Sequence, residues 1–487
     1  MYHPYIPNTE YIELQNVGAE AINLNLVKFT NGIDFTFPNI ELAPSEYIIA
    51  VQDQQAFESR YGRALNIAGQ YSGKLSNTGE RIRLEDAIGQ TILDFDFSDN
   101  WRSITDGDGF SLTLINPADT DSQAWDEKDS WRASAYLSGS PGEDDGGIIP
   151  NPSAIVINEV LAHSHAEAAD WIELHNTSAT TVDIGGWFLS DSSSDLIKYR
   201  IASGKKIAPS GYIVFYEDLH FNNPSAPGSN RAFALSENGE RLYLSSAEGN
   251  VLTGYRQVED FGGSETGVSF GRHYKASTGN YNFVAMAENT PGSANSYPKV
   301  GPIVINEIMY NPSWPVGSSY TNNQYEYIEL HNISDEPVAL YDFDNALPWK
   351  FTDGIDFTFP EDVPVTIPAG GYLLVVRDPE AFSWRYPNVD ASKIVGPYDG
   401  SLNNAGERLE LSMPGDVDES GEVYYVRVDR VTYSDGAHPE NSPDGIDHWS
   451  RTPDFGLVSL SRVSPENYGN DPDNWTASLP SPGTTNP

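Results

Sequence analysis

The six-residue run that decides the fold occurs three times: YIELQN at residues 11–16, WIELHN at 171–176 and YIELHN at 327–332. Each run opens with an aromatic residue, and its Ile and Leu lie two positions apart with Glu between them. Side chains of a β-strand alternate between two faces, so the pattern predicts a strand with one apolar face. The runs start about 160 residues apart, a spacing that fits whole domains in tandem rather than a solenoid repeat.

Two other stretches recur in the same order. A turn with Gly-Glu-Arg followed by an alternating strand appears as LSNTGERIRL (75–84), LSENGERLYL (235–244) and LNNAGERLEL (402–411). FTNGIDFTFP (29–38) returns almost unchanged as FTDGIDFTFP (351–360). Asn-Gly and Asp-Gly between alternating residues favour a β-hairpin with a type I′ turn. The repeats therefore predict three domains built from antiparallel strands.

The amino-acid composition agrees with a protein of antiparallel strands and excludes several kinds of partner and chemistry. The 487 residues include 42 Gly and 33 Pro, which together with alternating strands predict an all-β protein. The formal charge of −42 repels phosphate backbones and anionic lipid, so we expect neither nucleic acid nor an anionic membrane as partner. The sequence contains no run of 18 apolar residues, so we expect no membrane insertion. The absence of cysteine excludes disulfides, thiol catalysis and cysteine-bound zinc.

The repeats also set the expected domain boundaries. The first domain covers residues 1–145, the second 154–296 and the third 302–487, with linkers at 146–153 and 297–301. Gly, Pro and acidic residues accumulate just after the first domain, as in flexible connections.

The first copy lacks one strand that the others have. IVINEV (155–160) and IVINEI (303–308) precede the second and third copies of the deciding run, whereas MYHP (1–4) aligns with MYNP (309–312) and has nothing before it. We therefore expect the sequence to start inside its first domain. An export signal would then lie upstream, and we expect further domains upstream and downstream. The first domain should have an unpaired strand edge.

The order of these motifs is similar to that of the bacterial lamin tail domain. INE(V/I), (W/Y)IELHN, the GGWFLSD run at 185–191, the Gly-Glu-Arg hairpin and the closing W-x-A-S and S-P-G motifs follow one another over nearly the whole chain. The resemblance implies three tandem immunoglobulin-like β-sandwich domains, the first without its N-terminal strand. It also implies non-catalytic modules of large exported proteins.

We accordingly expect a spacer or adhesion region of a larger bacterial secreted or cell-surface protein, with a protein or surface glycan as its partner. The alternative is a carbohydrate-binding module attached to an extracellular hydrolase outside this sequence.

The recurring acids are the first candidates for chemistry. Glu13, Glu173 and Glu329 lie between apolar neighbours and point to the opposite face of their strands. Two facing carboxylates could act as acid and base in a hydrolase. Their recurrence in all three copies instead favours a role in the fold, as an Arg–Glu pair or a strand-edge hydrogen bond. We therefore predict no catalytic residue and no enzyme.

Two acidic loops are weak calcium candidates, the only cofactor that the sequence suggests. One resembles the first half of an EF-hand loop, with Arg427 where a bidentate acid is needed; its ligands would be Asp416, Asp418, Ser420 and Glu422. The other contains Asp106 and Asp108, in a DG-rich stretch that also suits an ordinary turn.

Three tryptophans are confined to the third copy. Trp314, Trp349 and Trp384 have no counterpart in the other copies, so they are candidates for an exposed platform that stacks on sugar rings.

Overall fold

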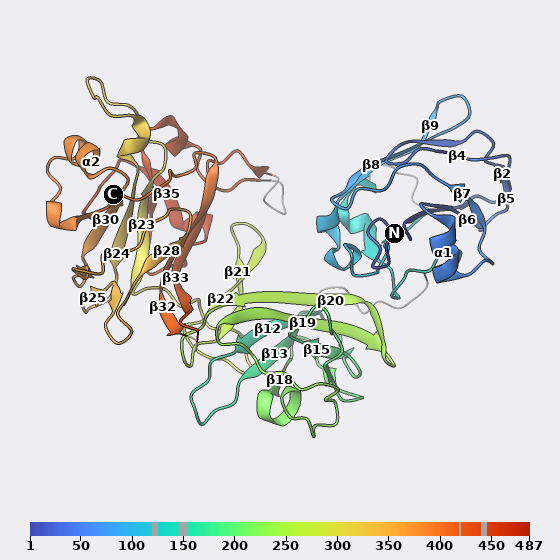
Figure 1. The fold of residues 1–487 in the computed structure, drawn as a ribbon, viewed down its shortest axis with the longest axis horizontal. Coiled ribbons are helices and arrows are strands. Elements are labelled where there is room, and N and C mark those ends of the chain that lie inside the picture. Colours follow the sequence, from blue (N-terminus) through green and yellow to red (C-terminus); the bar gives the residue numbers. More distant parts are fainter. Residues whose placement is uncertain (119–124, 146–153, 418–419, 440–445) are drawn as a thin grey trace. The chain divides into compact units, whose positions relative to one another are not determined.

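The computed structural model describes residues 1–118, 125–145, 154–417, 420–439 and 446–487 (Figure 1). Strands hold 39% of the chain and helices 9%, in many antiparallel sheets, so the prediction of an all-β protein with β-sandwich domains is confirmed. The expected linker at 146–153 lies outside the described residues. Within the described ranges, no helix is long and apolar enough to cross a membrane.

Contacts divide the chain into two compact units. The first comprises Met1–Val156, Asn176–Ser210 and Tyr243–Val258, and the second comprises Ile157–His175, Gly211–Leu242 and Glu259–Pro487. For comparison of local structure we call residues 1–145 segment one, residues 154–296 segment two and residues 302–487 segment three. The three-domain boundaries stay a prediction.

The described residues of segment three, within the second unit, form two large sheets and two short pairs of strands. The larger has the order β31 (Ile394–Val395), β30 (Tyr372–Val376), β24 (Tyr327–Asn332), β23 (Ile303–Met309), β34 (Ser459–Arg462) and β35 (Trp475–Ser478). The smaller has the order β28 (Lys350–Asp353), β32 (Gly406–Val417) and β33 (Val423–Ser434). Short pairs join β25 (Val338–Ala339) to β29 (Thr366–Ile367) and β26 (Tyr341–Asp342) to β27 (Leu347–Pro348), and helix α2 spans Pro379–Arg385.

One apolar core joins the two sheets of segment three. Ile328 on β24 and Ile305 on β23 belong to the same buried cluster as Leu409 on β32 and Val431 on β33. All four side chains are fully buried. The alternation seen in the deciding run thus places its Ile and Leu against the opposite sheet, which is the arrangement of a β-sandwich.

Segment two contains a five-stranded sheet with the order β18 (Tyr212–Tyr216), β13 (Trp171–Asn176), β12 (Ile155–Leu161), β21 (Phe270–Lys275) and β22 (Asn280–Ala285). A four-stranded sheet has the order β16 (Tyr199–Arg200), β15 (Phe188–Ser190), β19 (Gly239–Glu248) and β20 (Val251–Gly262). β14 (Val182–Asp183) pairs with β17 (Lys206–Ile207), and a π-helical turn spans Glu217–Phe221. The expected linker at 297–301 continues the pairing beyond β22, because Lys299 N–H donates to Ala285 O at 2.8 Å.

The described residues of segment one, within the first unit, form four sheets. A three-stranded sheet has the order β1 (Tyr11–Gln15), β6 (Tyr47–Val51) and β7 (Ile67–Gln70), and a four-stranded one has the order β4 (Phe35–Thr36), β3 (Lys28–Asn31), β8 (Glu80–Glu85) and β9 (Thr91–Phe97). β10 (Leu112–Leu114) pairs with β11 (Trp131–Ala133), β2 (Ile22–Asn23) pairs with β5 (Glu41–Leu42), and helix α1 spans Gln54–Tyr61.

The sheet of segment one is interrupted where the sequence lacks a strand. In segment three, β23 pairs with β24 on one side and with β34 on the other. In segment one, the corresponding strands β1 and β10 belong to separate sheets. Met1 holds the place of Met309: Tyr11 N–H donates to Met1 O at 3.2 Å, and the Met1 amine donates to Tyr11 O at 3.2 Å, as Met309 pairs with Tyr327. The alignment of the two MY motifs is therefore confirmed.

Candidate functional site: buried glutamates that close each segment

The Glu of the deciding run is bound to the end of its own segment in each copy; Glu173 and Glu329 are fully buried and Glu13 is half-buried. In segment three, Glu329 is fully buried; Gly483 N–H donates to its Oε2 at 2.6 Å and Asn306 Nδ2 donates to its Oε1 at 2.8 Å. Gly483 ends the closing S-P-G motif and has φ of +81°, in the left-handed region that glycine adopts without strain. The motif thus turns its backbone N–H onto the carboxylate.

The same contact closes the other two segments. In segment two, Glu173 accepts from Gly292 N–H at 2.5 Å and from Asn158 Nδ2 at 2.8 Å. In segment one, Glu13 accepts from Gly142 N–H. We call these three contacts the Glu–Gly closures. The recurring Glu therefore binds a backbone N–H of the closing turn, far along the chain, in place of the expected strand-edge hydrogen bond or Arg–Glu pair.

A second glutamate stands beside the first. Glu307 on β23 pairs in register with Glu329 on β24, so the two carboxylates share one face of the sheet. Ser459 Oγ donates to Glu307 Oε1 at 2.5 Å and Ser481 N–H donates to it at 3.0 Å. In segment two, Glu159 on β12 is held in the same way, by Ser269 Oγ at 2.5 Å and Thr290 Oγ1 at 2.7 Å.

Burial raises the pKa of these carboxyl groups. Desolvation, followed by the charge of Glu307, raises the pKa of Glu329 to about 8, and desolvation also raises that of Glu307. Desolvation raises the pKa of Glu173 and of Glu13 to about 7. At neutral pH the pair in segment three therefore favours holding a proton. A carboxyl pair that shares a proton resembles an acid–base dyad, but both members of this pair are 0% exposed.

A third acid, which the sequence analysis missed, precedes the aromatic residue of the run. Glu326 is fully buried and accepts from Leu402 N–H at 2.9 Å and from the Tyr398 hydroxyl at 3.1 Å. Burial raises its pKa to about 7. Glu10 makes the same contacts in segment one, to Leu75 N–H and the Tyr71 hydroxyl. The sequence signal that could have identified this site is the acidic residue found at this position in all three copies.

The Glu and the Arg of the GER motif bind different partners. The Glu accepts a backbone N–H four residues earlier and so closes the turn; the contacts are Ser76 to Glu80 at 2.6 Å, Ser236 to Glu240 at 2.8 Å and Asn403 to Glu407 at 2.7 Å. The Arg projects to the other face, where Arg81 binds Asp94 and Arg241 binds Asp260. Adjacent residues of a strand point to opposite faces, so the Glu and the Arg of this motif act separately.

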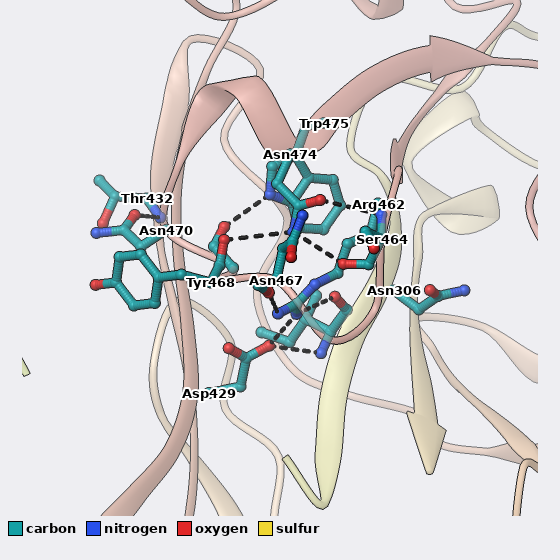
Figure 2. A network of polar contacts seen from close by, with 12 residues as sticks. Asn306, Asp429, Thr432, Arg462, Ser464, Asn467, Tyr468, Asn470, Asn474 and Trp475 are labelled. Carbon is teal, nitrogen blue, oxygen red and sulfur yellow. Dashed lines mark hydrogen bonds and ion pairs between the residues drawn. The ribbon is translucent and has the colours of Figure 1, made fainter. Parts of the chain in front are cut away.

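A buried arginine network in segment three also escaped the sequence analysis (Figure 2). Arg462 on β34 is 1% exposed and donates through NH1 to Asp429 Oδ2 at 2.7 Å. The same Asp429 oxygen accepts from Ile305 N–H at 2.8 Å, next to the irregularity in β23 between Ile305 and Glu307. A β-bulge removes hydrogen-bond partners from the backbone ladder, and the Asp429 carboxylate replaces one of them. The Arg462 guanidinium balances the charge of that carboxylate.

The three candidate tryptophans differ in their exposure to solvent. Trp349 is 6% exposed and belongs to the core of segment three, so it presents no platform. Trp314 is 68% exposed and Trp384 is 48% exposed. Arg385 NH1 donates to Ser313 O at 2.6 Å, so the residues next to these two indoles are in contact.

The EF-hand candidate lies at the end of a hairpin. Asp416 is on β32 and Glu422 immediately precedes β33, with Val417 paired to Val423. Ser420 is described in the turn, and Asp418 lies outside the described residues. Arg427 NH1 is 3.6 Å from Glu410 on the neighbouring strand, so the expected twelfth position is part of the sheet.

The second acidic loop is held by the chain itself. Asp106 shares a hydrogen bond with His3 Nδ1, and burial raises the pKa of Asp108. Calcium binding at either loop stays a prediction.

These features define an all-β protein of antiparallel sheets in which a strand glutamate binds the closing turn of each segment. The model of the Lamin Tail Domain matches residues 149–259 and 297–435, a little over half of the chain, and the chain belongs to that family. Segment one lies outside the matched residues. No curated protein and no solved structure matches the chain.

The raised pKa values make the stability of segment three depend on pH. Glu329 and Glu326 have folded pKa values of about 8 and 7 against an ordinary value of 4.5, so their contribution to stability is complete below pH 4.5 and is lost as the pH rises through 7 and 8. We expect Glu329→Gln to flatten this dependence by on the order of 1–3 kcal/mol. Gln keeps an acceptor for Gly483, and Asn306 can turn its amide to meet the new N–H.

Urea unfolding at pH 5 to 9, followed by hydrogen exchange in β24, measures the effect. The matched control is Glu336→Gln, which changes an exposed glutamate of the same segment. An equal pH dependence in both variants would contradict the assignment.

Proposed function

We propose that this chain is a non-catalytic structural and interaction region of a larger bacterial secreted or cell-surface protein. It would consist of three tandem lamin-tail-like domains that act as a spacer or in adhesion, outside the cell. The observation that carries the proposal is the Glu–Gly closure, which recurs in all three segments. The acids that could have formed a hydrolytic pair are used to join the start of each segment to its end.

Accessibility supports the same conclusion. Glu307, Glu329 and Glu326 are all fully buried, and each carboxylate accepts hydrogen bonds from the chain. A general acid or base must come within hydrogen-bond reach of a substrate, and these side chains present no surface to one. The net charge of −42 favours a well-solvated module and opposes nucleic acid or anionic lipid as partner.

The proposed spacer role can be tested by single-molecule force spectroscopy, in which the full chain is pulled by its two ends. We expect three separate unfolding events, each releasing about 500–650 Å of chain at 3.3–3.6 Å per residue. The closures join residues near the two ends of each segment, so each segment should resist force until its closing contacts break. Fewer than three events, or gradual extension without peaks, would contradict tandem domains that unfold one at a time.

The exposed Trp314 and Trp384 favour carbohydrate binding as the second candidate function. Aromatic rings on a surface stack on sugar faces, and these two indoles lie beside the Arg385–Ser313 contact. A glycan microarray with the full chain and with Trp384→Ala distinguishes the candidates. A sugar signal that is lost in the variant would favour the carbohydrate-binding module over the spacer.

A further inference from the structure

The dipeptide Asn-Gly occurs twice in the chain, at residues 31–32 and 238–239, and its backbone is bound differently at the two places. An asparagine before glycine can react with itself, because no side chain keeps the next main-chain nitrogen away from the asparagine Cγ. That nitrogen must be free to approach the carbon. Its hydrogen bonding in the folded chain therefore decides which of the two pairs reacts.

At the first pair, the main-chain nitrogen faces the asparagine side chain. Gly32 N–H donates to Asn31 Oδ1 at 2.9 Å, which brings the nitrogen beside the Cγ that carries this oxygen. Asn31 is exposed at the end of β3, so water reaches its side-chain amide. Gly32 has φ of +86°, and a Cβ at this position would overlap the Cδ1 atom of the buried Ile82. The fold thus requires glycine here, and glycine leaves the reaction unhindered.

At the second pair, the same nitrogen is held by the backbone. Gly239 N–H donates to Ser236 O at 3.1 Å and so closes the turn before β19. Asn238 is half-buried, and its own N–H donates to Ser236 Oγ at 3.3 Å. The Gly239 nitrogen would have to give up a backbone hydrogen bond before it could react. The two pairs therefore differ in reactivity for a reason that the dipeptide itself does not contain.

Segment three shows that the product of the reaction fits this hairpin. Asp353 lies at the position of Asn31, and Gly354 N–H donates to Asp353 Oδ1 at 2.9 Å, as Gly32 N–H does to Asn31. Gly354 also has a positive φ, of +95°. A carboxylate at this position is thus compatible with the backbone that both hairpins share.

We propose that Asn31 is a site of spontaneous deamidation, which converts the first hairpin to the sequence of the third. The Gly32 nitrogen attacks Asn31 Cγ and forms a cyclic imide. The bond from Cγ to Nδ2 breaks, and ammonia leaves with the proton of the Gly32 N–H. Water then opens the imide: addition at the side-chain carbonyl gives aspartate, and addition at the main-chain carbonyl gives isoaspartate.

The two products affect the hairpin differently. Aspartate keeps the length of the backbone and places a negative charge where Asp353 lies 3.5 Å from Arg408 NH1 in segment three. Isoaspartate carries the chain through Cγ and inserts one carbon between β3 and its turn. Phe29 and Phe35 pair across this turn, and both are buried, so the inserted carbon should loosen the hairpin.

The test follows deamidation in the full chain at alkaline pH. Samples taken over several days are digested at acidic pH, and the peptides are analysed by mass spectrometry, in which each conversion adds about one dalton. We expect Asn31 to react about ten times as fast as Asn238, the factor that one hydrogen bond on the attacking nitrogen adds to the barrier. In urea the two rates should become nearly equal, because both nitrogens are then free.

Two variants complete the test. Asn31→Gln keeps an amide but must close a larger ring, so it should stay unmodified over the same period. Asn31→Asp carries the first product from the start and should unfold at the temperature of the fresh chain.

Three results would overturn the proposal. The first is an equal or slower reaction at Asn31 than at Asn238 in the folded chain. The second is no reaction at Asn31 over a period that modifies the chain in urea. The third is a lowered unfolding temperature of Asn31→Asp, which would show that the first hairpin does not accept the product.

Discussion

Placing residues 303–308 directly before Met1 will raise the unfolding temperature of segment one by roughly 5–10 °C, which corresponds to a net gain of about 2 kcal/mol. Met1 already occupies the position of Met309, so the added strand enters in register with β1. Three of its side chains, the counterparts of Ile303, Ile305 and Ile308, join the core in segment three. Each contributes about 1.5–3 kcal/mol on burial, and the ordering of six residues opposes that gain.

Calorimetry of the full chain, with hydrogen exchange in β1 to assign the transition, measures this effect. The matched control is a graft of the same length with serine at the three core-facing positions. We expect that control to leave the temperature within about 2 °C of the unmodified chain, because exposed polar substitutions change stability little. Equal temperatures for both grafts would show that segment one closes its sheet by other means.

Replacing Arg462 by Met will destabilise segment three by about 3–5 kcal/mol, the effect of leaving one charge of a buried ion pair without its partner. Arg462 and Asp429 are both buried, and the Asp429 carboxylate must still accept from Ile305 N–H. The double variant Arg462→Met with Asp429→Asn keeps that acceptor and removes the charge. It should recover most of the lost stability.

Urea denaturation with hydrogen exchange in β23 and β34 measures both variants. Arg408→Met is the matched control, because the Arg408 guanidinium is half exposed and 3.5 Å from Asp353. A surface pair of this kind contributes about 0–1 kcal/mol. If Arg462→Met costs no more than the control, the charge on Asp429 is balanced elsewhere.

The hairpins show what the local sequence could predict and what it could not. The repeated Gly-Glu-Arg stretch predicted hairpins, and β8–β9, β19–β20 and β32–β33 are their arms. The Asn-Gly stretch also forms a hairpin, but Phe29 pairs with Phe35, so five residues rather than two make the turn. Turn residues identify where the chain reverses, whereas the neighbouring strand decides the length of the loop; here β8 pairs with β3 as far as Asn31.

The buried arginine network shows what a repeat comparison misses. The position of Arg462 holds Leu114 in segment one and Arg272 in segment two, so the motif order gave no common signal. Its partner Asp429 is 33 residues away on a strand of the other sheet. Only the packing of β23 against β33 creates the buried N–H that needs this charge.

The amino-acid sequence by itself determined the strands, their apolar faces and the recurrence of the glutamates, because alternation is a property of neighbouring residues. Tertiary structure decided what each glutamate does. The donors of the Glu–Gly closures lie 129, 119 and 154 residues from Glu13, Glu173 and Glu329. Burial and hydrogen bonding of a carboxylate depend on the atoms that surround it in space, so its raised pKa and its structural role arise only when the last turn of each segment reaches the first strand.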